Sequence, residues 1–359
     1  MANVTPANLA LLLGFSLAAT LAGCSTSDPG GGTKPGSGGA ATGSGGASAG
    51  SGGEGPMPTG SGGSGSGGSG SGGSGTGGAA PTGGDAMTMP DAGGGLDVMP
   101  GDGGPGAPSA GCGKAATDPP GQFAFNKTIM VGGVARTYHL RLPAGYDANK
   151  PYRTIFSFHG CGSHRDSLIN IQNAMGFDAI IIAPEQISGN CFDDQSNMSK
   201  DMFVFDALVQ WAEDNLCVDK SRIFSIGFSS GSWMTNILGC QRANVLRAKA
   251  NVSGGFTGAI NPAQDCKGPV AGIFLHDKDD TQNSIAGGMH ARDILLMENG
   301  CAMTSKPYTA VPANAAGLCV QYDGCKPGFP VVWCQTMGIN HDPQQTRSPN
   351  LFWQFLSQF

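Results

Sequence analysis

Residues 223–231 read Ile-Phe-Ser-Ile-Gly-Phe-Ser-Ser-Gly, an apolar run that passes directly into the pattern Gly-x-Ser-x-Gly. The apolar part predicts a buried strand, and a helix-like run continues from the motif to Leu238. In a sharp turn between a strand and a helix, a serine hydroxyl projects above the sheet, and flanking glycines leave room where a Cβ would clash. A chain rich in Gly and Ser produces such matches by chance, but this context favours Ser229 as a nucleophile over Ser230.

Strands and helices alternate on both sides of this turn. A glycine turn at Gly132-Gly133 joins two expected strands into a hairpin. Alternating elements predict an α/β fold with a mostly parallel sheet covered on both faces, in which ligands bind beyond the C-terminal strand ends. The expected strands are Thr128–Val131, Val134–Leu142, Arg153–Phe158, Ala179–Ala183, Ile223–Ile226, Ala248–Val252, Val270–Leu275 and Val331–Cys334, and further helices are expected at Asp201–Leu216, Ile285–Glu298 and Asn350–Phe359.

A nucleophilic serine needs a histidine base. In the α/β-hydrolase fold, the residues follow in the order serine, acid, histidine. After Ser229 the chain has three histidines: His276 ends an expected strand, His290 lies in an expected helix, and His341 lies in a loop before the last helix. Only a loop residue can reach over the serine from this side, so we expect His341 to be the base.

The acidic turn that follows the strand Val270–Leu275 is the expected position of the orienting carboxylate. Asp280 is the preferred acid, and Asp279 is the alternative. A turn of this composition can also serve solubility alone. The pattern Asp277-Lys-Asp279 is weakly suggestive of calcium, but it lacks the glycine and the distal glutamate of an EF-hand loop. We therefore expect a triad of Ser229, Asp280 and His341 and no metal.

An oxyanion hole would complete such a site. One donor is expected to be the backbone N–H of Ser230, directly after the nucleophile. The other is expected from the loop after the strand Arg153–Phe158, where His159-Gly-Cys-Gly162 resembles the HG-type loop and the N–H of Cys161 is the preferred donor. His159 itself is interpreted as structural rather than as a second base.

The cysteines indicate a compartment outside the cytosol. Of 11 cysteines, Cys24 lies near the N-terminus, and the other ten lie between residues 112 and 334. An even number in one folded region predicts up to five disulfides, with the stretch from Cys301 to Cys334 pinned locally. Metal binding is a weaker interpretation, because no Cys-x-x-Cys pair is present and the histidines lack zinc-ligand spacing.

The N-terminal third has a different character. Leu9–Ala22 is an apolar run of signal-peptide length. Its end overlaps Leu21-Ala-Gly-Cys24, which resembles the lipobox of bacterial lipoproteins, in which the cysteine is lipidated. More than half of the 61 glycines lie between Ser25 and Gly111. Such a segment cannot bury enough apolar surface to fold. We expect a signal peptide at 1–23, a lipidated Cys24 with a Gly/Ser tether at 24–111, and one domain at 112–359.

The charge pattern limits the possible partners. The net charge is −6, and no cluster of Lys and Arg occurs. A surface that binds phosphate backbones needs such a cluster, so nucleic acid is not expected as a partner. We expect an exported monomer that is anchored through lipid to the outer membrane or cell surface, or that is extracellular.

Several segments together resemble the feruloyl esterase and acetylxylan esterase family, whose relatives include secreted polyhydroxybutyrate depolymerases. These segments are Cys112–Lys114, Arg136–Pro143, Pro151–Gly160, Gly227–Gly231 and the closing His341, and the resemblance covers nearly all of 112–359. The resemblance implies hydrolysis of carboxylic esters through an acyl-enzyme, without a cofactor. The carboxylate of the family's His-Gly-x-x-Asp pattern falls on Asp280.

Three positions depart from the family pattern. Asp277 replaces the usual glycine, Ser232-Trp233 stands where small residues or methionine are common, and Asn340-His341-Asp342 replaces Gly-His-Ser. Trp233 is a candidate for an aromatic acyl pocket or, equally, for core packing. The leading hypothesis is an esterase for phenolic (feruloyl) or acetyl esters on plant polysaccharide. The alternatives are a polyester depolymerase and a non-catalytic binding lipoprotein of the same fold.

Overall fold

The computed structural model describes residues 106–187, 190–192, 200–256, 258 and 260–359. The expected signal peptide, the lipidated Cys24 and the tether up to residue 105 lie outside the described residues. Residues 106–111 pack against the domain: Ser109 is buried and its hydroxyl donates to Leu216 O at 2.7 Å. No helix in the described ranges has the length and apolar character needed to span a membrane.

The described residues form one large mixed sheet with strands in the order β1-β2-β4-β3-β5-β6-β7-β10-β9-β8. The six central strands run parallel, and two antiparallel strands extend each edge. The strands are β1 (Phe123–Val131), β2 (Val134–Arg141), β3 (Tyr152–Phe158), β4 (Ala179–Pro184), β5 (Val218–Phe228), β6 (Ala248–Val252), β7 (Ala271–Asp277), β8 (Ser305–Pro307), β9 (Cys319–Tyr322) and β10 (Val331–Thr336).

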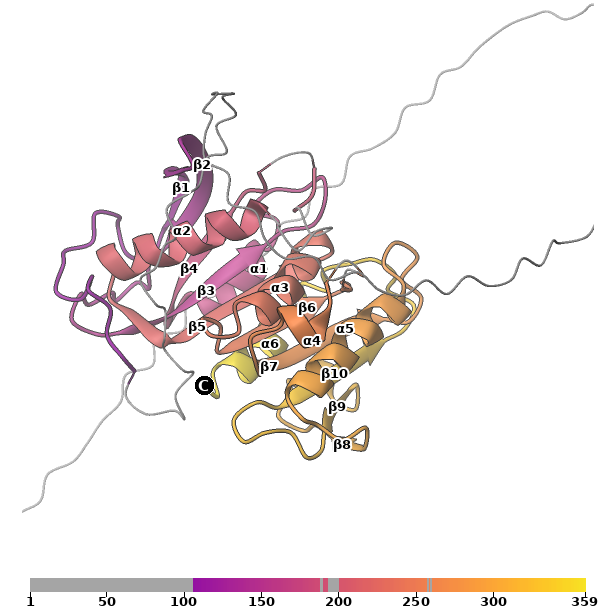
Figure 1. Cartoon of the computed structure of the whole chain (residues 1–359). Helices are drawn as coiled ribbons and strands as arrows, with labels where there is room; N and C mark the ends of the chain where they lie inside the picture. Colours follow the sequence, from indigo (N-terminus) through magenta and orange to yellow (C-terminus); the bar gives the residue numbers. More distant parts are fainter. Residues whose placement is uncertain (1–105, 188–189, 193–199, 257, 259) are drawn as a thin grey trace, which may run out of the picture. The chain divides into compact units, whose positions relative to one another are not determined.

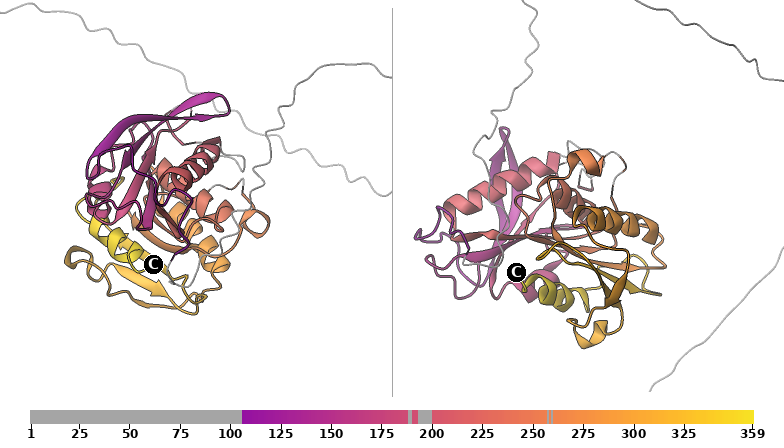
Figure 2. Two further views of the ribbon diagram at one scale, coloured as in Figure 1. Left: turned by 90° about the vertical axis from the view of Figure 1, so that its left-hand side faces the viewer. Right: turned by 60° about the horizontal axis from the view of Figure 1, so that its bottom comes forward.

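Helices cover both faces of the sheet (Figures 1 and 2). One buried cluster joins α2, α3 and α5 to one face, and a second cluster joins α1 and α6 to the other. Alternate residues of a central strand enter opposite clusters, as Ile180 and Ile181 do in β4. The helices are α1 (Ile169–Met175), α2 (Lys200–Asn215), α3 (Ser230–Gln241), α4 (Pro262–Asp265), α5 (Ile285–Glu298) and α6 (Ser348–Leu356), with a 3-10 turn at Ala313–Ala315.

The α/β-hydrolase architecture expected from the sequence is confirmed, and the differences lie at its margins. Every expected strand and helix is present, although β5 begins at Val218 and α6 begins at Ser348. The elements α1, α4, β8 and β9 were not predicted from the sequence. These elements are short, so their hydrophobic period is too brief to stand out.

Five disulfides join the ten expected cysteines, all within the domain. Two of them, Cys301–Cys325 and Cys319–Cys334, hold the stretch around the antiparallel edge strands β8 and β9. The local pinning expected for this stretch is confirmed. A set of disulfides this dense is typical of a protein that works outside the cytosol.

Candidate active site

The turn between β5 and α3 has the strained geometry of a nucleophile elbow. Ser229 has φ 55° and ψ −121°, a conformation that costs a non-glycine residue free energy and persists only when its surroundings hold it. A Cβ on Gly227 would lie 2.2 Å from Gly231 O, and a Cβ on Gly231 would lie 2.1 Å from Phe158 O. Glycine is therefore required at both flanking positions, as the motif predicted.

The structure brings Ser229, His341 and Asp280 into one chain of hydrogen bonds. The hydroxyl of Ser229 lies 3.0 Å from Nε2 of His341, and Nδ1 of His341 lies 2.8 Å from Oδ2 of Asp280. Since the carboxylate can only accept, Nδ1 carries the proton, and Nε2 is free to accept from the serine. The three side chains come from the ends of β5, β7 and β10, all on the side of the sheet where its parallel strands end.

Asp280 is held as a carboxylate. Burial alone would raise its pKa, but hydrogen bonds from His341 and from the backbone N–H groups of Gln282 and Asn283 hold the pKa of Asp280 below its usual value. Asp279, the alternative acid, has a half-exposed side chain that accepts from Lys278 and from the N–H of Gly338. The geometry therefore supports Asp280 rather than Asp279.

The loop that carries His341, residues 338–342, is fastened to the acidic turn after β7. The N–H of Ile339 donates to Oδ2 of Asp277 at 3.1 Å. The backbone N–H and the hydroxyl of Thr281 both donate to Oδ1 of Asn340. Asp277 and Asn340, two of the positions that depart from the family pattern, therefore belong to the contacts that hold the histidine.

The other two candidate histidines differ in position: His276 lies beside the triad acid, with Nε2 3.7 Å from Oδ2 of Asp280, and His290 lies on α5. His276 is buried and its Nε2 contacts Asn283 O at 2.9 Å, and burial lowers its pKa below the usual value. His290 is exposed on α5. Within the described part of the chain, neither forms a hydrogen bond with Ser229, in agreement with the choice of His341.

The expected oxyanion donors lie beside the serine. A Cβ on Gly160 would lie 3.1 Å from Cβ of Ser229, so the loop after β3 passes directly over the elbow. Cys161 within that loop is bonded to Cys191, and Gly162 N–H donates to Asn190 O at 2.6 Å. Among the described residues, the N–H groups of Cys161 and Ser230 have no hydrogen-bond partner. Neither N–H is therefore engaged by another described residue.

Two contacts beside the proposed triad were not predicted from the sequence. Asn283 Nδ2 donates to Ser253 O at 2.8 Å and lies 3.5 Å from the hydroxyl of Ser229. The ring of Phe228 packs against the ring of His341 with centroids 4.8 Å apart. Asn283 follows Asp280 by three residues, but nothing in the sequence pattern separates it from an ordinary loop asparagine.

Trp233 lies on α3, one turn beyond Ser229. Its side chain is half-buried, and a Cβ on Gly255 would meet its ring at 2.9 Å. The ring therefore lies against the loop that follows β6, on the side of the elbow.

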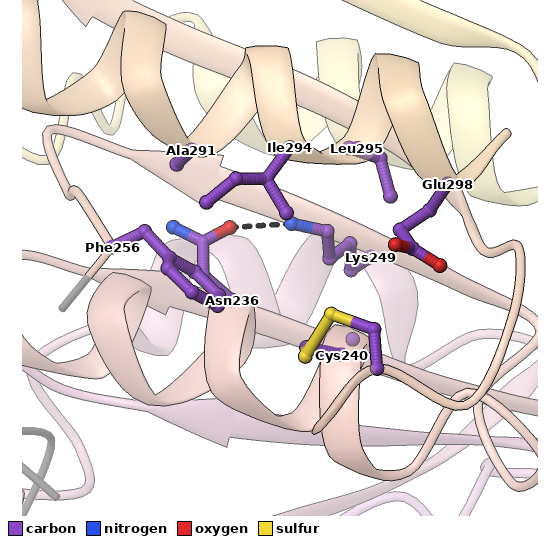
Figure 3. Close-up of a pocket in the computed structure, with 10 residues that line it drawn as sticks. Asn236, Cys240, Lys249, Phe256, Ala291, Ile294, Leu295 and Glu298 are labelled. Atoms are coloured by element: carbon purple, nitrogen blue, oxygen red, sulfur yellow. Dashed lines mark hydrogen bonds between the residues drawn. A yellow bond between two sulfur atoms is a disulfide. The ribbon is translucent and has the colours of Figure 1, made fainter. Parts of the chain in front are cut away.

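A small pocket elsewhere in the domain contains no member of the triad (Figure 3). It is lined by residues of α3, β6 and α5, and the ammonium group of Lys249 points at the amide oxygen of Asn236 within it. Complete burial lowers the pKa of Lys249 to about 7. The amide of Asn236 also donates to Gly255 O at 2.7 Å. These contacts tie the elbow helix to the loop after β6.

Comparison with known proteins gives close relatives in sequence. The chain is 32% identical over 275 residues to feruloyl esterase D of Neurospora crassa, covering 70% of this chain and 91% of that protein. It is 30% identical over 264 residues to feruloyl esterase C of Emericella nidulans, with the same coverage. No family model matches the chain.

Comparison with solved structures gives weaker similarity. The feruloyl esterase module from Clostridium thermocellum superposes with a TM-score of 0.49 at 15% identity, covering 71% of this chain and 92% of the module. An acetyl xylan esterase from Aspergillus awamori superposes with a TM-score of 0.48 at 14% identity, covering 62% of this chain and 94% of that enzyme.

Proposed function

The chain belongs to the feruloyl esterase family and is a carboxylic ester hydrolase, and from this premise we propose that Ser229, His341 and Asp280 are its catalytic triad. The observation that carries the proposal is the unbroken hydrogen-bond chain from the hydroxyl of Ser229 through the ring of His341 to the carboxylate of Asp280. A strained elbow and two available N–H groups beside it complete the set that acyl transfer needs.

In the first half of the reaction, Ser229 Oγ attacks the ester carbonyl while His341 Nε2 takes its proton. Asp280 stabilises the imidazolium that forms. The N–H groups of Ser230 and Cys161 donate to the oxyanion, and the N-terminus of α3 adds a favourable dipole. His341 then gives its proton to the leaving alcohol, and an acyl-enzyme remains on Ser229.

In the second half, His341 takes a proton from water as the water oxygen attacks the acyl carbonyl. The tetrahedral intermediate collapses, the proton returns to Ser229 Oγ, and the free acid leaves. The side chains and backbone of the chain, together with the attacking water, supply every proton and every hydrogen bond in the two halves of the reaction. No step of this mechanism uses a cofactor.

The proposed substrates are feruloyl or acetyl esters on plant polysaccharide, and the names of the relatives support the feruloyl ester first. We assign Trp233 to the acyl side of the site, where an indole ring can lie against a phenolic ring. We expect Trp233→Leu to raise KM for methyl ferulate several-fold and to leave hydrolysis of p-nitrophenyl acetate nearly unchanged. Equal effects on both esters would remove Trp233 from the acyl pocket.

The proposal is tested by steady-state hydrolysis with the oxidised protein. Wild type is expected to hydrolyse p-nitrophenyl acetate and methyl ferulate, and to act more slowly on a hydroxybutyrate oligomer. Ser229→Ala is expected to lower kcat by about 10⁴-fold or more. Ser230→Ala keeps its backbone N–H and is the matched control, with activity near that of wild type. A folded Ser229→Ala protein that retained wild-type kcat would refute the triad.

We further propose that the protein is exported and anchored through lipid on Cys24, on the support of the lipobox-like Leu21-Ala-Gly-Cys24. The Gly/Ser segment between Cys24 and residue 106 would then act as a tether that lets the enzyme search a bulky substrate. Labelled palmitate should be incorporated into wild type and not into Cys24→Ala. A Cys24→Ala protein that still partitioned into membranes and carried label would contradict this anchor.

A further inference from the structure

His159 directly follows β3, and only 1% of its side chain is exposed. Both of its ring nitrogens face oxygen atoms. Nδ1 lies 2.8 Å from the carbonyl oxygen of Gly160, and Nε2 lies 3.1 Å from Oε2 of Glu185. A backbone carbonyl can only accept a hydrogen bond, and so can an ionised carboxylate.

Glu185 is ionised at this position. Burial alone would raise its pKa, but hydrogen bonds from His159 and from the backbone and guanidinium of Arg165 lower the pKa of Glu185 to about 2. The carbonyl oxygen of Gly160 can only accept, so Nδ1 of His159 is the donor in that contact.

We infer that His159 positions the peptide unit that supplies the Cys161 N–H to the oxyanion, by donating from Nδ1 to the carbonyl oxygen of Gly160. The inference rests on the proposed function, in which that N–H is a donor. It assigns His159 a positioning role, because the ring acts through the backbone rather than on the substrate.

The peptide unit between Gly160 and Cys161 links His159 to the oxyanion donor. The carbonyl of Gly160 and the N–H of Cys161 belong to the same planar trans peptide, so they point in opposite directions. When His159 holds the carbonyl, the N–H of Cys161 is fixed on the other side. A hydrogen bond to the carbonyl also polarises the amide, which makes the N–H a stronger donor.

The position of this peptide relative to the nucleophile is fixed by close packing. A Cβ on Gly160 would lie 3.0 Å from the ring of Phe228 and 3.1 Å from Cβ of Ser229. The hydroxyl of Ser230 adds only a long contact, at 3.4 Å, with His159 O. A rotation of the peptide would therefore displace the donor from the site where the oxyanion develops.

Other groups around His159 limit how much activity is expected to be lost when this residue is replaced. Glu185 is shared with Arg165, whose guanidinium also donates to Asn126 Oδ1, and the ring of Phe192 covers His159 at a centroid distance of 4.9 Å. The N–H of Ser163 also donates to Gly160 O, at 3.2 Å. Since this second donor remains without His159, we expect its loss to impair the oxyanion donor rather than to abolish it.

The kinetic test uses two substitutions of the same residue. His159→Leu removes both hydrogen bonds and keeps apolar bulk against Phe192. It is expected to lower kcat about 10-fold, less than the loss of a whole oxyanion donor, with little change in KM. His159→Asn places an amide N–H near the position of Nδ1, so it should recover part of the lost kcat.

His139→Leu is the matched control. His139 is also buried, burial lowers its pKa to about 4, and its ring nitrogens have no hydrogen-bond partner among the described residues. Its replacement should leave kcat unchanged. A phosphonate analogue of the tetrahedral intermediate should lose affinity for His159→Leu by the same factor as kcat/KM. Wild-type kcat in His159→Leu, a change in KM alone, or no recovery in His159→Asn would overturn the positioning role.

The hydrogen bond is tested on the wild-type chain by nitrogen NMR with labelled histidine. His159, assigned by its loss in His159→Asn, should show a protonated Nδ1. An unprotonated Nδ1 on His159 would overturn the positioning role. Ser229→Ala separates the two proposals: if it is active the proposed triad fails, and if it is inactive while His159→Leu is fully active only this inference fails.

Discussion

Asp279 and Asp280 are neighbours in the chain, yet their carboxylates have different surroundings. The side chain of Asp279 is 45% exposed, whereas that of Asp280 is fully buried against His341. The sequence could place the acid in this turn but could not choose between the two. The choice depends on which side chain turns inward at the end of β7, and that is decided by tertiary contacts rather than by residue type.

We predict that Asp280→Asn lowers kcat by about 10⁴-fold with little change in KM, because an amide at this position favours the wrong tautomer of His341. Hydrolysis of p-nitrophenyl acetate provides the measurement. Asp279→Asn is the control, and its exposed side chain makes a near-wild-type kcat the expected result. If the two variants exchanged these effects, Asp279 would be the acid.

Glu185 provides a pH-dependent contribution to stability. Its pKa is lowered from 4.5 to about 2, so the folded state binds this proton less readily than the unfolded state. The contribution is complete above pH 4.5 and is lost as the pH falls toward 2. We predict that Glu185→Gln flattens the acid limb of a plot of unfolding free energy against pH. An unchanged acid limb in the variant would show that this carboxylate is not stabilised by folding.

At the scale of elements, the site depends on how the end of β7 is joined to the loop after β10. These strands are parallel neighbours, with Asp277 opposite Thr336. The carboxylate of Asp277 is buried and accepts from the N–H groups of Asp279 and Ile339. A glycine at position 277 could not make either bond. The departure of this chain from its family's pattern therefore has a structural consequence for the loop that carries His341.

We predict that Asp277→Ala destabilises the fold by about 1–3 kcal/mol, because two partly buried N–H groups lose a charged acceptor. It should also lower kcat, since His341 is held less firmly. Urea unfolding and ester hydrolysis measure the two effects. Asp323→Ala, which removes only an exposed ion pair with Lys306, is the control for loss of an aspartate. Full stability together with full activity in Asp277→Ala would contradict this role.

Elements were predictable in proportion to their length and pattern. The elbow, β6 and α5 were expected from apolar periodicity and glycine placement, and they are present. β8 and β9 were missed because three or four residues show no usable alternation, and disulfides rather than propensity hold that region. The contacts of His159 with Glu185 were also missed, because they join β3 and β4 ends that only the sheet order brings together.

For the whole molecule, the five disulfides contribute according to the loops that they close. Cys112–Cys217 closes a separation of 105 residues, and Cys319–Cys334 closes one of 15. We predict that replacing the first pair by serine costs about 4–5 kcal/mol and replacing the second costs about 3 kcal/mol, because the longer loop loses more unfolded-state entropy. Urea unfolding of the two double variants measures the difference. A larger loss from the short loop would show that local packing, not loop closure, dominates.

Covalent trapping determines whether Ser229 forms the acyl-enzyme. The oxidised protein is reacted with an ester-like phosphonate, digested and examined by mass spectrometry. We expect one phosphonate per chain, attached to Ser229, and none in Ser229→Ala. Label on Ser230, or equal label in Ser229→Ala, would show that Ser229 is not the nucleophile.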